Sequence, residues 1–154
     1  MSLHGNEKIL EVGCGGGNLS RFLSKKLPKG KLVCIDNSKY WIDKARKRLR
    51  NFENVELLIK NVLNLKRKNY FDIIVLHFVL HDISKRKRTI NILKNSLKKK
   101  GLIYIAELIR KSHGMNSNEI KRLMTQEEFL ENYSKEEIVF PIRGQVYYEV
   151  FKKR

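Results

Sequence analysis

The sequence contains little cysteine and proline, and it has no long apolar run. Its two cysteines, Cys14 and Cys34, form neither a C-x-x-C motif nor a disulfide framework. We read both as free thiols of a reducing compartment. The longest apolar stretch, residues 73–80, is interrupted by His77 and is far too short to span a membrane. Because the N-terminus also has no apolar signal segment, the sequence predicts a cytoplasmic protein with no membrane partner.

Acidic residues are scarce relative to basic ones. Sixteen Asp and Glu face 33 Lys and Arg in the 154-residue chain, which gives a net charge of +17. Such an excess is typical of a nucleic-acid-binding surface or of a solvated, lysine-rich exterior. The basic clusters, residues 44–50, 66–68, 85–88 and 98–100, are spread over four segments without the interleaved aromatic residues of a stacking platform. We therefore favour the solvated exterior and keep RNA as an alternative partner.

Apolar periodicity predicts strands that alternate with helices in one domain, residues 1–154. Buried strands are expected at residues 8–12, 31–35, 55–59, 71–78 and 102–106. Helices are expected at residues 18–27, with Leu19, Phe22, Leu23 and Leu27 on the inner face, and at residues 39–50, with Trp41, Ala45 and Leu49 inward. A further helix is expected between a Ser84 cap and a terminating Gly101, and a short one from a capping box, Thr125 to Glu128.

The last two expected strands, residues 137–142 and 145–151, are joined only by Arg143-Gly144. Parallel strands need a crossover of about a dozen residues or more, so this pair must be antiparallel. The preceding alternation of strands and helices predicts a parallel sheet with right-handed crossovers. The expected fold class is therefore α/β, with a mostly parallel sheet that ends in an antiparallel hairpin.

A glycine-rich stretch, EVGCGGG, links the first expected strand to the first helix. Bare backbone at a helix N-terminus lets a nucleotide-like ligand approach closely. The dinucleotide pattern G-x-G-x-x-G would need a glycine where this chain has Asn18, and the observed glycines are Gly13, Gly15 and Gly17. Asp36, at the end of the second strand, stands where a ribose-binding carboxylate belongs. The glycine spacing and the closing hairpin favour S-adenosylmethionine over a nicotinamide dinucleotide.

The order of these motifs resembles that of the class I S-adenosylmethionine-dependent methyltransferases. ILEVGCGGGNLSRFL is similar to their motif I, CIDNS to their next acidic motif, FDIIVLHFVLHDI to their fourth-strand motif, and LKNSLKKKGLIYIAEL to their turn into strand five. The resemblance runs from about residue 8 to the C-terminus and is closest to the small type 11 and ubiquinone/menaquinone-biosynthesis-like members. It implies a three-layer, Rossmann-like sheet of order 3-2-1-4-5-7-6 with strand 7 antiparallel.

The resemblance also implies roles for matching positions around S-adenosylmethionine. It places Glu11, Gly13, Cys14, Gly15, Gly17 and His77 around the methionine part of the cofactor, with Glu11 holding the glycine loop. Asp36 would hold the ribose hydroxyls, and Asn37 would pack beside the adenine. Asn61, in the KNVLNL stretch where the family often has aspartate, would accept a hydrogen bond from the adenine amino group. Val62 would offer its backbone N–H.

Two residues after the fourth strand, His81 and Asp82, are candidate catalytic groups. Methyl transfer needs a positioned nucleophile and a base where the acceptor carries a proton, and His81 is suited to that task near neutral pH. In the alternative interpretation, both residues only begin the next turn. No metal is expected, because His77-x-x-x-His81-Asp82 has helical spacing in a segment predicted to be strand and loop.

Barely seven residues precede the first expected strand, whereas the family usually carries one or two covering helices there. The site is then open, completed by a second chain, or part of a truncated protein, and a monomer or a homodimer is expected. The expected function is transfer of a methyl group from S-adenosylmethionine to an unidentified acceptor, with a small molecule favoured over RNA. The alternative from another class is a non-catalytic basic binding module on the same fold.

Overall fold

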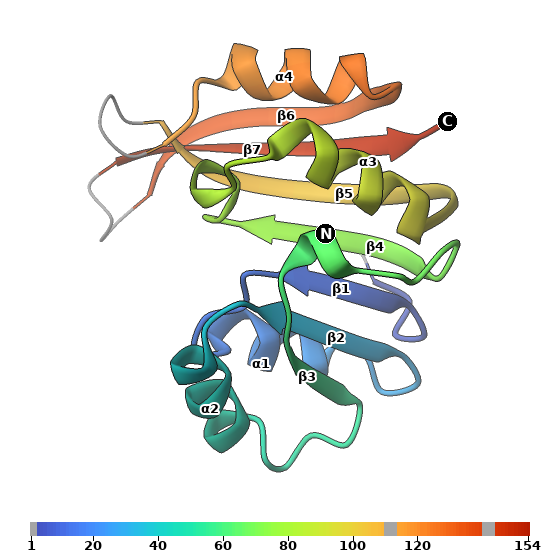
Figure 1. Ribbon diagram of the computed structural model, residues 1–154, viewed down its shortest axis with the longest axis vertical. Coiled ribbons are helices and arrows are strands. Elements are labelled where there is room, and N and C mark those ends of the chain that lie inside the picture. Colours follow the sequence, from blue (N-terminus) through green and yellow to red (C-terminus); the bar gives the residue numbers. More distant parts are fainter. Residues whose placement is uncertain (1–2, 110–113, 140–143) are drawn as a thin grey trace.

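Seven strands pair into one sheet in the order β3-β2-β1-β4-β5-β7-β6 (Figure 1). The computed structural model describes residues 3–109, 114–139 and 144–154. Its strands are β1 (Lys8–Val12), β2 (Lys31–Asp36), β3 (Val55–Ile59), β4 (Phe71–His77), β5 (Leu97–Ile109), β6 (Phe129–Val139) and β7 (Gly144–Lys153). The first five run parallel, and β7 is antiparallel to β5 and β6. The predicted order and the antiparallel hairpin are confirmed, while part of its predicted turn, Arg143, lies outside the described residues.

Helices pack on both faces of the sheet and make three layers. They are α1 (Asn18–Lys25), α2 (Lys39–Arg48), α3 (Arg86–Ser96) and α4 (Ser117–Gln126), with 3₁₀ turns η1 (Val62–Asn64) and η2 (Leu80–Asp82). One apolar cluster joins the sheet to α1 and α2, and the other joins it to α3 and α4. No helix in the described ranges is long and apolar enough to cross a membrane.

Strand β4 shows how the sequence produces two packed faces. Its residues Ile73 and Val75 belong to the cluster under α1 and α2, whereas Ile74 and Leu76 belong to the cluster under α3. Successive side chains of a strand point to opposite faces, so a strand covered on both sides needs an unbroken apolar run. The central position of β4, between β1 and β5, follows from that run.

The predicted ends of the third major helix are wrong. Lys85 rather than Ser84 precedes α3, and no side chain caps it. The helix ends at Ser96, so Gly101 lies inside β5 instead of terminating the helix. A Cβ at Gly101 would lie 3.1 Å from the carbonyl oxygen of Asp72 in β4. The glycine therefore permits a close approach between neighbouring strands.

The capping box predicted from Thr125 to Glu128 is also wrong. Thr125 lies near the end of α4, whose N-terminus is capped where Asn116 Oδ1 accepts from the backbone N–H of Asn118 at 2.8 Å. Residue Phe129 begins β6 rather than a helix. The local pattern that favours a helix start is overridden here by the pairing of β6 with β7.

Two aromatic residues predicted to face the core are exposed. Trp41 is 43% exposed and Phe22 is 58% exposed. The buried face of α2 consists of Ile42, Ala45 and Leu49, whose spacing of three and four residues keeps them on one side of the helix. Trp41 is displaced from that face by one residue and instead lines the cavity described next.

Candidate functional site

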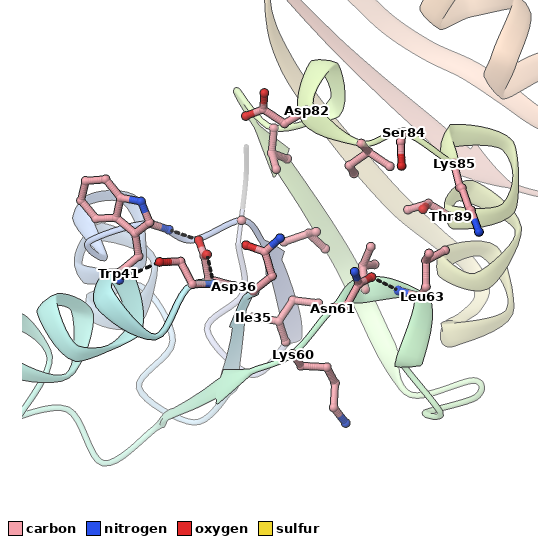
Figure 2. Close-up of a pocket in the computed structure, with 18 of the residues that line it drawn as sticks. Ile35, Asp36, Trp41, Lys60, Asn61, Leu63, Asp82, Ser84, Lys85 and Thr89 are labelled. Atoms are coloured by element: carbon pink, nitrogen blue, oxygen red, sulfur yellow. Dashed lines mark hydrogen bonds between the residues drawn. The ribbon is translucent and has the colours of Figure 1, made fainter.

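A cavity of about 460 Å³ opens beyond the carboxyl ends of β1, β2 and β4 (Figure 2). Ligands of open α/β sheets bind at this edge, where the strand order reverses. Among the residues selected from the sequence, its lining includes Gly13, Gly15, Asp36, Asn37, Asn61, Val62 and Asp82, but not Glu11, Cys14, Gly17, His77 or His81. Several other lining residues were not predicted as site residues from the sequence, among them Trp41, Lys60, Leu63, Ser84, Lys85 and Thr89.

The three alternate glycines of the loop satisfy different requirements. All three have positive φ, 69° at Gly13, 51° at Gly15 and 78° at Gly17. A Cβ at Gly13 would lie 2.3 Å from Cγ2 of Val79, and one at Gly17 would lie 3.1 Å from Leu49. A Cβ at Gly15 would meet nothing within 4 Å. Gly13 and Gly17 therefore permit close packing, and Gly15 presents bare backbone to open space beside the cavity.

This difference predicts unequal effects of two matched substitutions on stability. Gly13→Ala is expected to lower the free energy of unfolding by about 3 kcal/mol, because the cost of a left-handed backbone conformation adds to the cost of the steric clash with Val79. Gly15→Ala carries only the backbone cost, about 1 kcal/mol. Urea denaturation of both variants measures the difference. Adding Val79→Ala to Gly13→Ala should recover part of the loss, and equal losses in the two single variants would contradict the packing role.

Asp36 connects the glycine loop to the start of α2. Its Oδ2 accepts from the backbone N–H of Gly15 at 3.0 Å, and its Oδ1 accepts from the backbone N–H of Ser38 at 2.9 Å. The hydroxyl of Ser38 in turn caps α2 by accepting from the backbone N–H of Trp41. Each carboxylate oxygen has two lone-pair sites, so both retain capacity for a donor in the cavity.

The opposite side of the cavity is formed by η1 and α3. Asn61 caps η1, because its Oδ1 accepts from the backbone N–H of Leu63 at 2.9 Å (Figure 2). Thr89 of α3 is fully buried, and its hydroxyl oxygen has no hydrogen-bond partner among the described residues. A buried hydroxyl without a partner is costly, and this one belongs to a residue that lines the cavity. Thr89 is therefore a candidate ligand contact that the sequence pattern did not reveal.

Glu11 lies beneath the loop and away from the cavity. It is 2% exposed, and its Oε2 accepts from the hydroxyl of Ser20 at 2.6 Å and from the thiol of Cys34 at 3.6 Å. These contacts join β1 to α1 and β2. Burial raises the pKa of Glu11 to about 7, although the two hydrogen bonds oppose that shift.

The raised pKa of Glu11 predicts a pH-dependent stability. Since its folded pKa of about 7 lies above the ordinary 4.5, the folded state holds a proton that the unfolded state has lost. Protonated Glu11 therefore contributes to the stability of the fold below pH 4.5. This contribution is lost as the pH rises to about 7, which lowers the free energy of unfolding by roughly 3 kcal/mol. Glu11→Gln keeps an oxygen acceptor and should be more stable than the parent at pH 8 but not at pH 4.5.

Denaturation curves between pH 4.5 and pH 8 measure this effect. The exposed Glu53→Gln variant removes the same charge from the surface and should follow the parent protein at each pH. The interpretation is contradicted if Glu11→Gln and the parent lose stability in parallel.

A histidine of η2 and a buried carboxylate of β5 lie in contact beyond the carboxyl end of β4. His81 Nδ1 lies 2.6 Å from Glu107 Oε1, and the backbone N–H of His81 donates to Glu107 Oε2 at 3.2 Å. Arg86 holds the same turn by donating to the carbonyl oxygens of Leu80 at 3.1 Å and His81 at 2.9 Å. Glu107 is 0% exposed, so its carboxylate holds the imidazole of His81 from a buried position in the sheet.

Glu107 is a candidate functional residue that the sequence analysis missed. The sequence feature that could have indicated it is an acidic residue at the end of an otherwise apolar strand, IYIAE. This strand lies beside the one that leads to His81. His81 and Asp82 both lie in η2, with His81 Nε2 3.6 Å from Asp82 Oδ2. His77 lies one turn earlier, and burial lowers its pKa against the opposing charge of Glu107. Within the described ranges, no three His, Cys, Asp or Glu side chains form a group that could hold a metal ion.

Comparison with known proteins agrees with this geometry. A family model described as a methyltransferase domain matches residues 3–153. The demethylmenaquinone methyltransferase of Thermotoga maritima is 31% identical over 103 residues, which cover 67% of this chain and 44% of that protein. The chain spans about half the length of the curated relatives it matches.

Solved structures share the fold at low sequence identity. A SAM-dependent methyltransferase from Methanosarcina mazei has a TM-score of 0.85 at 19% identity, covering 98% of this chain and 94% of that chain. The N-methyltransferase NodS from Bradyrhizobium japonicum WM9, solved in complex with S-adenosyl-L-homocysteine, has a TM-score of 0.81 at 18% identity, covering 96% of this chain and 78% of that chain. These likenesses confirm the Rossmann-like methyltransferase fold predicted from the motifs.

Proposed function

The chain belongs to the methyltransferase-domain family, and on that premise we propose that it transfers a methyl group from S-adenosylmethionine to a small-molecule acceptor. The observation that carries the proposal is the cavity beside Asp36 and Gly15, where a carboxylate with spare acceptor capacity lies next to bare backbone. The proposal takes residues 1–154 as one cofactor-binding domain. It places the protein in the cytoplasm as a monomer or homodimer, and its two free cysteines support a reducing compartment.

The residues present fit the cofactor. Asp36 would accept from the ribose hydroxyls, with Asn37 and Trp41 beside the adenosine. Figure 2 shows Asp36 and Trp41 on one side of the cavity and Thr89 on the other, with Asn61 between them. The unpartnered hydroxyl of Thr89 is buried behind this half of the cavity and would contact the base after a local rearrangement. When bound, the cofactor supplies a methyl group on a positively charged sulfur.

The glycine loop would accommodate the methionine part of the cofactor. Gly15 exposes its backbone there, while Gly13, Cys14 and Gly17 hold the shape of the loop. Glu11 acts indirectly in this proposal, because its buried hydrogen bonds hold α1 and β2 against β1. His77, at the end of β4, would stay neutral near pH 7 because burial lowers its pKa.

The pair of His81 and Glu107 would remove a proton from the acceptor. Nδ1 of His81 faces the Glu107 carboxylate, so Nε2 is the nitrogen left to receive a proton. Glu107 is the positioning residue, since its hydrogen bond to Nδ1 fixes the orientation of the ring. Asp82 lies beside the same ring and lines the cavity, which makes it a candidate acceptor contact.

A small-molecule acceptor is favoured by the relatives that match most of this chain. One is named a demethylmenaquinone methyltransferase, and another is named an (S)-coclaurine N-methyltransferase. The test is incubation of the purified chain with S-adenosylmethionine labelled in its methyl group and a cell extract separated by size. Label in the small-molecule fraction is expected. Label only in the RNA fraction would contradict the acceptor class, and no transfer to any fraction would contradict the activity.

A further inference from the structure

We propose that the groove between α1 and α2 binds a single-stranded nucleic acid. The groove measures about 640 Å³ and shares no lining residue with the cavity beside Asp36. Its lining consists of five cations and one amide, namely Arg21, Lys44, Lys47, Arg48, Arg50 and Asn51. A concave surface with only cationic and amide side chains matches a chain of phosphates.

The positive charge of the groove is not neutralised by nearby acids. Within the described part of the chain, none of its five cations forms a salt bridge with a carboxylate. The only acid of α2, Asp43, instead pairs with Lys39 at 2.6 Å and with Arg46 at 2.7 Å. The charges available to a ligand are therefore concentrated on one side of α2, although the sequence distributes basic residues over the whole helix.

Exposed aromatic rings adjoin this groove. Tyr40 is 60% exposed and Trp41 43% exposed, with ring centroids 5.1 Å apart. The ammonium of Lys44, which lines the groove, lies 4.5 Å from the Tyr40 ring centroid and 5.1 Å from that of Trp41. The sequence-based view that aromatics are not interleaved with the cations is wrong here, because helical spacing brings residues three and four apart together.

Cations combined with exposed rings are the usual features of a single-strand site. Phosphates would contact the groove, and an unpaired base could stack on Tyr40. A bilayer is a weaker match, since membrane-binding helices present a protruding apolar face and this groove is recessed and lined by polar groups. The groove comes from α1, α2 and the residues after α2, whereas His81 and Glu107 lie at the ends of β4 and β5. The binding is thus independent of the acceptor in the proposed reaction.

The test is fluorescence anisotropy of labelled 12-nucleotide RNA and DNA of one sequence, with the full chain, at 50 and 200 mM salt. Engagement of about four phosphates predicts a log–log salt slope near −3. Lys47→Gln combined with Arg50→Gln should weaken binding at 50 mM salt more than tenfold and reduce the slope by roughly 1. Tyr40→Ala should weaken binding about tenfold at both salt concentrations, because stacking is not ionic.

Matched controls separate the groove from the general charge of the protein. Lys66→Gln combined with Lys68→Gln removes two exposed lysines elsewhere, and Tyr133→Ala removes a distant ring that is 53% exposed. Both should change affinity by less than about twofold. Equal weakening by the Lys47/Arg50 and Lys66/Lys68 double variants would overturn the proposal, as would Lys47- and Arg50-dependent binding to anionic phospholipid vesicles without oligonucleotide binding. Tighter binding of RNA than DNA would identify RNA as the ligand, and equal binding would support either nucleic acid.

Discussion

Replacing Asp36 by alanine is expected to weaken the binding of S-adenosylhomocysteine on the order of a hundredfold. The substitution removes the carboxylate proposed to accept from both ribose hydroxyls. It also removes the acceptor of the hydrogen bond from the Gly15 backbone N–H. This bond, with an N–Oδ2 distance of 3.0 Å, holds the glycine loop. Isothermal titration calorimetry measures the loss directly and requires no knowledge of the methyl acceptor.

Two further variants make the Asp36 result specific. Asp36→Asn keeps one oxygen acceptor and is expected to give intermediate affinity. Asp43→Ala removes a carboxylate of α2 that pairs with the surface cations Lys39 and Arg46. This variant should bind S-adenosylhomocysteine as tightly as the parent protein does. Affinity retained in Asp36→Ala, with the fold intact by circular dichroism, would contradict the proposed ribose contact.

The largest kinetic effect is expected at His81. His81→Ala should slow methyl transfer by a factor on the order of a hundred to ten thousand, the usual contribution of a general base. Binding of S-adenosylhomocysteine should be unchanged, because His81 does not line the cofactor cavity. Single-turnover transfer of labelled methyl into the small-molecule fraction measures the rate.

Glu107 provides the matching test of positioning. Glu107→Gln is nearly the same size but lacks the charge that holds the ring, so the rate should fall while the acceptor KM and the cofactor affinity stay the same. Added imidazole should restore part of the rate in His81→Ala and none in Glu107→Gln, because the second variant still fills the space of the histidine ring. Full activity in His81→Ala would remove the base from the mechanism.

The mostly parallel sheet and its antiparallel hairpin could be predicted from the strand patterns, whereas the full strand order followed from the resemblance of the motifs to the methyltransferase family. FDIIVLHF is apolar on both faces and requires cover on both sides, and the connection predicted at Arg143-Gly144 is too short for a parallel crossover. The predictions failed where tertiary packing outweighs local signals. Gly101 reads as a helix terminator but lies in β5, because pairing with β4 outweighs the local signal; a Cβ there would lie 3.1 Å from the carbonyl oxygen of Asp72.

The candidate site could be predicted only where its residues follow a local motif. Asp36 and Gly15 are recognisable because each lies at the end of a strand or in a glycine loop. Glu107 could not be selected, since its partner is 26 positions away and the contact depends on the register of β5 against β4. Thr89 was missed for a related reason, because an unpartnered hydroxyl becomes visible only when its surroundings are known.

Arg48 connects the two proposed ligand sites of this protein. It lines the basic groove, and its Nη1 donates to the carbonyl oxygen of Gly16 in the glycine loop. A phosphate that draws this guanidinium away would remove a restraint on the loop that S-adenosylmethionine is proposed to occupy. By thermodynamic linkage, the factor by which the nucleic acid alters cofactor affinity must equal the factor by which the cofactor alters nucleic-acid affinity. One side chain thus gives the two sites a route to reciprocal control.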